Sequence, residues 1–233
     1  MTPDELASAQ VAFNLASRLL YVEPSDEEVE RYLAPQLFSE APFAMDNGTV
    51  RAGLALLDAW CAEARKSIAS GSESLHRCAC DLRCDWLNLL VGVGEPKAPS
   101  WAGYYLNPSS VLIGESALGV RRLYQAHGFR IERQNQEPDD NLGIMLEFIA
   151  MLIQLELDGD GDAARECQIQ LLQKYVLPWL PLWHWSVEKF ARTSFYHGVG
   201  DMVFGFVQTY AARFGFRYCD DEKSPQFVWE GQQ

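Results

Sequence analysis

The chain has 233 residues, 48% of them hydrophobic, with 32 acidic and 19 basic side chains, a formal net charge of −13 and a pI near 4.7. This composition excludes nucleic acid and anionic membrane surfaces as natural partners, because their phosphates need a basic face, and it favours a basic partner. A chain of this length can bury a full hydrophobic core, either as one large domain or as two small, closely packed units.

The chain shows no feature of a secreted or membrane protein. Residues 1 to 5 lack the basic start of a signal peptide, and six cysteines are too few for a disulfide scaffold. The longest apolar stretch, residues 142 to 155, is interrupted by Glu147 and Gln154 and is too short to span a bilayer. We therefore expect a cytoplasmic protein without stable membrane insertion.

Helical periodicity of the apolar residues runs through almost the whole chain, and no alternating strand pattern is evident. Capping boxes at Thr2 to Glu5 and at Ser25 to Glu28 predict the starts of the first two helices. The second helix is expected to stop before Pro35. In chain order, the other expected helices cover residues 49 to 68 (capped by Thr49), 75 to 93, 115 to 127, 140 to 157, 162 to 176, 180 to 192 and 194 to 214, before a polar tail.

One long segment, residues 92 to 110, is too rich in glycine and proline to be helical. It carries Trp101, Tyr104 and Tyr105, which either pack beneath the loop or contact a ligand. We predict an all-α fold, a globular bundle of about ten helices with this irregular loop near the middle. Residues 1 to 233 form a single domain, within which an N-terminal half (1 to 91) and a C-terminal half (111 to 220) would meet at the loop.

Carboxylates cluster at the start of the helix expected from residue 140. Pro138 ends any helix that arrives from upstream, and Asp139 or Asp140 can cap the next one. That helix is apolar on more than one side, so we expect it at the centre of the fold. The polar residues at its N-terminus would then lie beside the core. Glu147, within the apolar run, either ties down a structural amide or basic group or contributes to a ligand pocket.

Candidate metal and catalytic groups have simpler structural interpretations. The acidic run 158 to 162 lacks the glycine and glutamate of a calcium loop, because residues 163 and 169 are Ala and Ile. We interpret Cys78, Cys80 and Cys84, near His76, as buried or incidental cysteines. His184 and His197 lie among aromatic residues and are interpreted as core histidines with one partner each. No catalytic, cofactor or metal motif remains, so we expect a protein that is not an enzyme.

Several motifs in register resemble the TorD/DmsD/NarJ family, the cytoplasmic chaperones of exported molybdenum-cofactor enzymes. They are Glu137-Pro138-Asp139-Asp140-Asn141 with Leu146-Glu147-Phe148, the stretch Asp85 to Gly92, the loop Pro99-Ser100-Trp101, Tyr105-Leu106, and Val111 to Ser116. The resemblance covers residues 81 to 155. Two positions depart from the family pattern: Ser100 replaces the second proline of a Pro-Pro-Trp loop, and Asn141 replaces a histidine.

The resemblance implies a chaperone that binds the twin-arginine leader and the apo-form of a molybdoenzyme catalytic subunit, supports cofactor insertion and proofreads before export. An acidic, aromatic groove also suits two guanidinium groups followed by an apolar stretch. The peptide-binding residues that the family pattern assigns are Trp86, Leu89, Leu90, Pro99, Trp101, Gly114, Glu137, Asp139, Asp140 and Asn141.

Two alternatives stay open on the sequence. Within the family, the chain could be an assembly chaperone of the nitrate-reductase type, whose client subunit is not exported. From another class, it could be a helical metal-dependent enzyme that uses His76, Cys80, Cys84 and the acidic residues. The sequence does not choose between a monomer and a homodimer.

Overall fold

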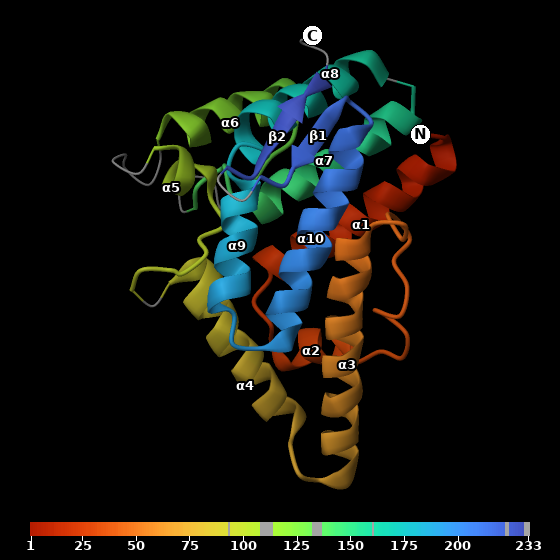
Figure 1. Ribbon diagram of the computed structural model, residues 1–233, viewed down its shortest axis with the longest axis vertical. Helices are drawn as coiled ribbons and strands as arrows, with labels where there is room; N and C mark the ends of the chain where they lie inside the picture. Colours follow the sequence, from red (N-terminus) through yellow and green to blue (C-terminus); the bar gives the residue numbers. More distant parts are fainter. Residues whose placement is uncertain (93, 108–113, 132–136, 160, 222–223, 231–233) are drawn as a thin grey trace.

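The computed structural model describes residues 1–92, 94–107, 114–131, 137–159, 161–221 and 224–230. Within these ranges the fold is built almost entirely of helices, as the sequence predicted (Figure 1). The α-helices are α1 (Pro3–Tyr21), α2 (Asp26–Tyr32), α3 (Gly48–Ser70), α4 (Leu75–Trp86), α5 (Ala102–Leu106), α6 (Glu115–Ala126), α7 (Leu142–Leu157), α8 (Gly161–Leu171), α9 (Leu180–Phe190) and α10 (Ser194–Ala212). Two π-helical turns, η1 (Leu87–Val91) and η2 (Leu172–Val176), continue α4 and α8.

The first helix starts follow the sequence closely. Thr2 and Glu5 form the complete capping box of α1. At the start of α2, the Ser25 side chain accepts from the Glu28 amide, whereas the Glu28 carboxylate pairs with Arg18 and Arg31. The cap of α3 is Asn47 rather than the predicted Thr49: its side-chain oxygen accepts from the amides of residues 49 and 50. An Asx side chain at this position satisfies two of the free amides at the helix start.

The core joins helices from both ends of the sequence. α7 is the most apolar helix and buries ten of its residues, α1 packs along it, and α3 packs along α10. Figure 1 shows α3, α10 and α9 side by side, with α6, α7 and α8 gathered toward the other end of the molecule. One continuous cluster of buried side chains includes members from every one of these helices, so the proposed halves share a single core.

Two glycines bring α3 and α10 into close contact. A Cβ added at Gly53 would lie 2.6 Å from the carbonyl oxygen of Gly198, and one at Gly198 would lie 2.6 Å from the carbonyl oxygen of Gly53. No side chain fits at either position without moving backbone, because ordinary Cβ contacts are longer than this.

Two expectations about irregular segments were wrong. Part of the loop from 92 to 110 is helical, as α5, and the polar tail contains a hairpin of β1 (Phe216–Cys219) and β2 (Gln226–Trp229), paired antiparallel with Phe216 opposite Trp229. The strands are four residues each, too short to show a convincing period of two. Tyr218 and Phe227 pair across the strands and pack on Phe204 of α10, which supplies the burial that the hairpin needs.

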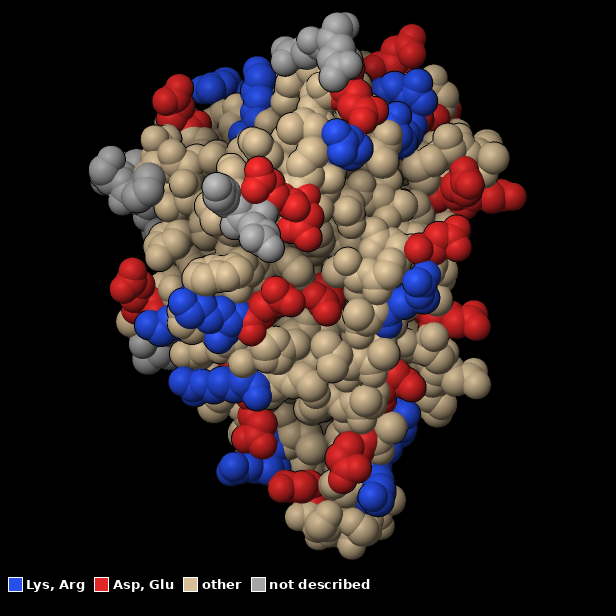
Figure 2. All heavy atoms as spheres, viewed as in Figure 1, with Lys and Arg blue, Asp and Glu red and all other residues tan. Residues whose placement is uncertain are grey.

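The surface carries charge of both signs. Figure 2 shows acidic and basic side chains interspersed over one face, with broad uncharged areas between them and a group of acidic side chains near the middle, over α9 and α10. In the described ranges, every helix is too short or too polar to cross a membrane.

Replacing Gly53 by alanine tests the close approach of α3 and α10. We expect Gly53→Ala to lower the free energy of unfolding by about 1–3 kcal/mol, because the new methyl group overpacks the interface. Gly48→Ala, at the first position of the same helix, is the matched control: its Cβ would meet only the Arg51 side chain at 3.9 Å. That change should be neutral or stabilising by up to about 1 kcal/mol. Equal denaturation midpoints for the two variants would contradict the packing argument.

Candidate functional site

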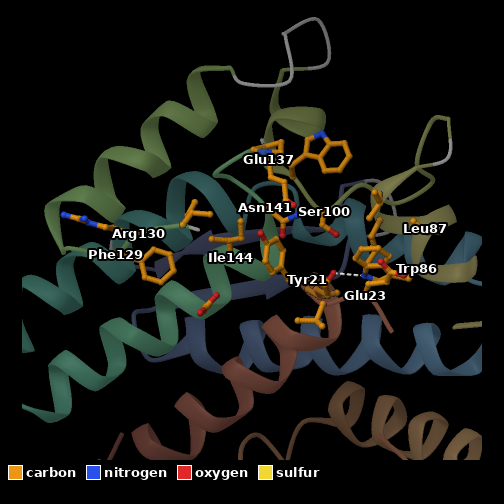
Figure 3. A pocket seen from close by; sticks show the side chains of 18 residues that line it. Tyr21, Glu23, Trp86, Leu87, Ser100, Phe129, Arg130, Glu137, Asn141 and Ile144 are labelled. Atoms are coloured by element: carbon orange, nitrogen blue, oxygen red, sulfur yellow. Dashed lines mark hydrogen bonds between the residues drawn. The ribbon is translucent and has the colours of Figure 1, made fainter. Parts of the chain in front are cut away.

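A cleft of about 890 Å³ lies where the ends of α1 and α4 meet the start of α7 (Figure 3). Its walls come from segments far apart in the sequence. The lining residues are Leu20, Tyr21, Val22, Glu23, Trp86, Leu87, Leu90, Val91, Ser100, Trp101, Phe129, Arg130, Ile131, Glu137, Pro138, Asn141, Ile144 and Glu147.

Backbone hydrogen bonds join the loop before α5 to the start of α7. The Leu142 amide donates to the Ser100 carbonyl at 2.5 Å, and the Ala102 amide donates to the Asp140 carbonyl at 3.0 Å. Trp101 and Asn141 thereby form an isolated antiparallel bridge. This pairing holds the two residues on the same wall of the cleft.

The N-terminus of α7 is capped by Asn141, not by Asp139 or Asp140. The Asn141 side-chain oxygen accepts from the Gly143 amide at 2.8 Å. Gly143 is itself required, because a Cβ there would lie 2.9 Å from the Cβ of Tyr21, so the end of α1 approaches the start of α7 closely. The Asn141 side chain, at a position where the resembling family usually has histidine, therefore caps α7.

Trp86 joins the end of α4 to the end of α1. Its indole N–H donates to the Leu20 carbonyl at 2.9 Å, and the ring is half-buried in the cleft wall. The π-turn η1 follows at once, and its buried Leu90 also lines the cleft. A backbone hydrogen bond joins the segment after the turn to η1, because the Ala98 amide donates to the Leu89 carbonyl at 2.8 Å. π-turns of this kind often mark functional sites.

Asp139 lies beneath the cleft and is 1% exposed. Both of its oxygens accept from the Nε of Arg121, at 3.0 and 3.1 Å, and Oδ2 also accepts from a terminal nitrogen of that guanidinium at 2.5 Å. The Tyr124 hydroxyl donates to the Asp139 carbonyl at 2.9 Å. This buried ion pair fastens α6 to the start of α7.

Asp140 is also buried, with 1% exposure, and faces α5. Its Oδ2 accepts from the Gly103 amide at 2.7 Å. Burial raises the pKa of Asp140, and the Ser116 hydroxyl and the Gly103 amide offset part of that rise. Neither aspartate lines the cleft, so a ligand in the cleft cannot touch either carboxylate in this structure.

The predicted binding residues therefore separate into two groups. Five of the ten lie together on the cleft wall, namely Trp86, Leu90, Trp101, Glu137 and Asn141. The other five do not line it: Leu89, Pro99, Asp139 and Asp140 are buried, and Gly114 caps the start of α6. The Val111–Ile113 part of the family motif and Asp160 lie outside the described residues.

Other lining residues were missed from the sequence. Tyr21 and Glu23 end α1 and its following turn, and Phe129 to Ile131 follow α6. No motif marks them, since only the packing of α1 on α7 brings them to the cleft. For Glu147 the sequence left a structural partner or a ligand pocket open. Its side chain is exposed and lies on the cleft wall.

The charged side chains that line the described cleft are mostly acidic. Glu23, Glu137 and Glu147 lie on its walls against one basic residue, Arg130. Glu23 also forms an ion pair with Arg83, which does not line the cleft: Glu23 Oε1 lies 2.7 Å from Arg83 Nε. The cleft therefore combines carboxylates with aromatic and aliphatic surface, which suits a cationic ligand with an apolar portion.

Asp85, the first residue of the other family motif, is 1% exposed and serves the fold. Its carboxylate accepts from the Arg192 and Thr193 amides at 2.9 and 2.8 Å and from the Thr193 hydroxyl at 2.8 Å. It thus satisfies free amides where α10 begins and joins α4 to that helix.

The thiol and imidazole groups of α4 are only partly brought together. His76 Nε2 lies 3.5 Å from Cys80 Sγ, and its Nδ1 lies 3.1 Å from Asp26. Cys78 is buried and Cys84 is exposed. Among the described residues, no third ligand atom joins His76 Nε2 and Cys80 Sγ.

Comparison with known proteins gives the class of this protein. Residues 49–184 match the family model described as nitrate reductase delta subunit. The Tat proofreading chaperone DmsD of Salmonella typhi is 30% identical over 118 residues, 51% of this chain and 54% of that protein. The chaperone protein TorD of Vibrio vulnificus strain YJ016 is 26% identical over 200 residues, 82% of this chain and 86% of that protein. The chaperone protein TorD of Vibrio cholerae strain O395 is 27% identical over 132 residues, 55% and 60% of the two chains.

The chain spans about half the length of the DmsD relative that it matches. The matched proteins are chaperones, and the class that they define is not an enzyme class. The chain belongs to the nitrate reductase delta subunit family, which is the TorD/DmsD/NarJ group of chaperones.

The two buried aspartates should differ in their effect on stability. Asp139→Asn should lower the free energy of unfolding by about 1.5–3 kcal/mol, because Arg121 loses its charge-assisted hydrogen bonds. Asp140→Asn should change it by less than about 1 kcal/mol, since an amide oxygen still accepts from Gly103 and a buried charge is removed. Urea denaturation at pH 7 measures both, and a larger loss for Asp140→Asn would reverse our assignment.

The stability of the wild-type chain relative to Asp140→Asn should also depend on pH. Because the folded-state pKa of Asp140 is raised above its ordinary value of 3.8, its protonated form is favoured in the folded state. This contribution is complete below pH 3.8 and is lost as the pH rises through the folded-state pKa. The wild-type minus Asp140→Asn difference in unfolding free energy should therefore fall as the pH increases. A difference that stays constant would show that the carboxyl is not desolvated.

Proposed function

We propose that the cleft binds the twin-arginine leader of a molybdenum-cofactor oxidoreductase subunit and holds its apo-form in the cytoplasm until the cofactor is inserted. The observation that carries the proposal is the combination of three glutamates with Trp86 and Trp101 in one cleft. All of these residues except Glu23 belong to the family motifs. The relatives named as Tat proofreading and TorD chaperones support it.

The chemistry of such a leader matches the cleft. Each guanidinium group can pair with a carboxylate through two hydrogen bonds and can stack on an aromatic face. The apolar residues that follow the arginines need aliphatic surface, which Leu87, Leu90 and Ile144 provide. A volume of about 890 Å³ accommodates a few side chains rather than a whole leader. We therefore assign to the cleft the arginine pair and the first apolar residues.

The acidic wall can be tested by charge removal. Glu137→Gln with Glu147→Gln should weaken binding of a twin-arginine leader peptide by about 2- to 30-fold, since each exposed pair contributes roughly 0.2–1 kcal/mol. The remaining affinity should depend less on salt, because fewer charge pairs are screened. Isothermal titration calorimetry at two salt concentrations measures both effects.

The control for this experiment removes the same charge elsewhere. Glu63 on α3 and Glu166 on α8 are exposed and do not line the cleft, so Glu63→Gln with Glu166→Gln should leave the affinity unchanged. An equal loss in both double variants would indicate a general effect of net charge and would contradict binding at this cleft.

The aromatic wall can be tested at Trp101. Trp101→Ala should weaken leader binding by more than about tenfold, because a central aromatic contact typically contributes 2 kcal/mol or more. Trp185→Ala is the matched control, since that indole is 54% exposed on α9 and lies outside the lining. Calorimetry with the same peptide compares the two variants, and unchanged affinity in Trp101→Ala would remove the aromatic wall from the proposal.

A second candidate function keeps the chaperone role without the leader. The matching family model is described as nitrate reductase delta subunit. In this candidate function the client is a subunit that is not exported. Capture of the apo-subunit with its leader deleted, together with no calorimetric response to the leader peptide, would favour this candidate. Capture that requires the leader would favour the first.

A further inference from the structure

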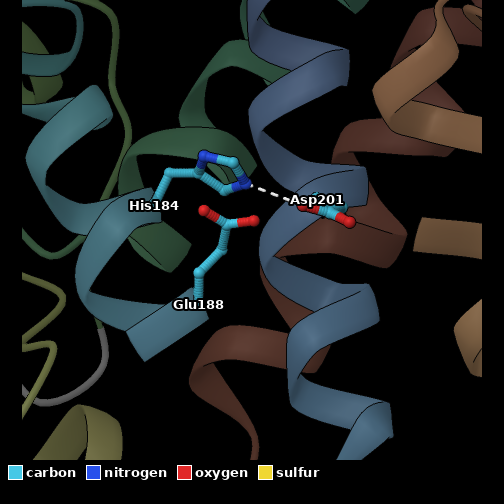
Figure 4. Close-up of side chains that lie close together, drawn as sticks. All are labelled: His184, Glu188 and Asp201. Atoms are coloured by element: carbon cyan, nitrogen blue, oxygen red, sulfur yellow. Dashed lines mark hydrogen bonds and ion pairs between the residues drawn. The ribbon is translucent and has the colours of Figure 1, made fainter. Parts of the chain in front are cut away.

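A second group of polar side chains lies away from the cleft, between α9 and α10 (Figure 4). His184 and Glu188 are one turn apart on α9, and Asp201 faces them from α10. One ligand atom from each, the imidazole nitrogen and two carboxylate oxygens, lies within 4.8 Å of the other two. Imidazole and carboxylate together form a ligand set typical of a divalent transition-metal ion.

The imidazole is oriented toward this group by packing. Its ring stacks on Phe204 with centroids 4.5 Å apart and planes 17° apart, and its Nε2 lies 2.8 Å from Asp201 Oδ1. Gly200 permits this approach, because a Cβ there would lie 2.8 Å from Val187 Cγ1 and 3.9 Å from His184 Cδ2. Phe204 is held in turn by Tyr218 of the hairpin, so an apolar layer lies behind the polar group.

The separation of the ligand atoms fits one small cation. The three ligand atoms lie within 4.8 Å of one another. Two atoms bound to one tetrahedral ion at about 2.1 Å are about 3.4 Å apart, so the widest separation needs to close by up to about 1.4 Å. Glu188 is exposed and can make this movement, whereas the His184 and Asp201 side chains are each 16% exposed and already in contact. The open side of the group leaves a further coordination position for water.

The local charges favour a cation at this position. Glu188 and Asp201 bring two carboxylates together beside the His184 imidazole. The neighbouring ammonium group of Lys189 lies over the Trp185 ring at 4.4 Å. The net charge of the chain, −13, adds a general attraction for cations.

We propose that His184, Glu188 and Asp201 bind a zinc-class divalent ion that joins α9 to α10. His184 and Asp201 form the preorganised part of the site, and Glu188 completes it from the solvent side. This site is separate from the leader cleft, because none of its three ligands lines that cleft.

Calorimetric titration of the metal-free 233-residue chain with Zn²⁺ tests this site. We expect one equivalent per chain, with binding weakened in Glu188→Gln by more than the roughly 10-fold that loss of an outer-shell partner can cost. Glu188 is exposed, so this variant should fold normally. His184→Gln, which keeps a hydrogen-bond donor for Asp201 but loses the imidazole, should bind more weakly still.

The thiols of α4 provide the necessary control. Cys80→Ser with Cys84→Ser should leave the affinity for Zn²⁺ unchanged, and Co²⁺ bound by the wild-type protein should show no thiolate charge-transfer absorption. Absence of Zn²⁺ binding, equal affinity in Glu188→Gln and wild type, or loss of binding in the cysteine variant would each overturn the proposal.

Discussion

The cleft depends on one backbone pairing, between Ser100–Ala102 and Asp140–Leu142. Two hydrogen bonds and the Trp101–Asn141 bridge join a loop to the start of the most apolar helix, α7. Buried amides and carbonyls need partners, so this pairing both satisfies the backbone and fixes the aromatic wall. Because α7 is packed on several sides, its first turn is a rigid support for the loop.

The carboxylates of the family motifs differ in burial. Asp85, Asp139 and Asp140 are each 1% exposed and join helix to helix, or loop to helix, through amides and a guanidinium. Glu137 and Glu147 lie on the cleft wall, where a ligand can reach them. An acidic motif thus supplies both buried structural carboxylates and carboxylates on the cleft wall, and burial distinguishes the two.

α10 is likewise joined to the rest of the fold at its start and at its middle. Asp85 satisfies the amides at its start, and Phe204 supports both His184 and the hairpin. Glycines allow this helix to approach α3 and α9 closely, so the interfaces leave little freedom for rearrangement.

Local sequence determined the helices, the all-α class and the family. Capping at Thr2 and Ser25 acts within one turn, so it can be identified without tertiary structure. The family motifs contain Trp86, Trp101, Glu137 and Asn141, which lie together on the cleft wall. The tail hairpin was missed, because its four-residue strands are stabilised by packing on a distant helix.

Tertiary structure alone decided which polar groups face solvent. Asp139 and Glu137 are two residues apart in one acidic run, yet the first is enclosed by α6 and the second reaches the cleft. Tyr21 joined the site through the contact of α1 with Gly143, and His184 met Asp201 through the packing of α9 on α10. Burial and these contacts depend on residues far away in the chain, which local pattern does not encode.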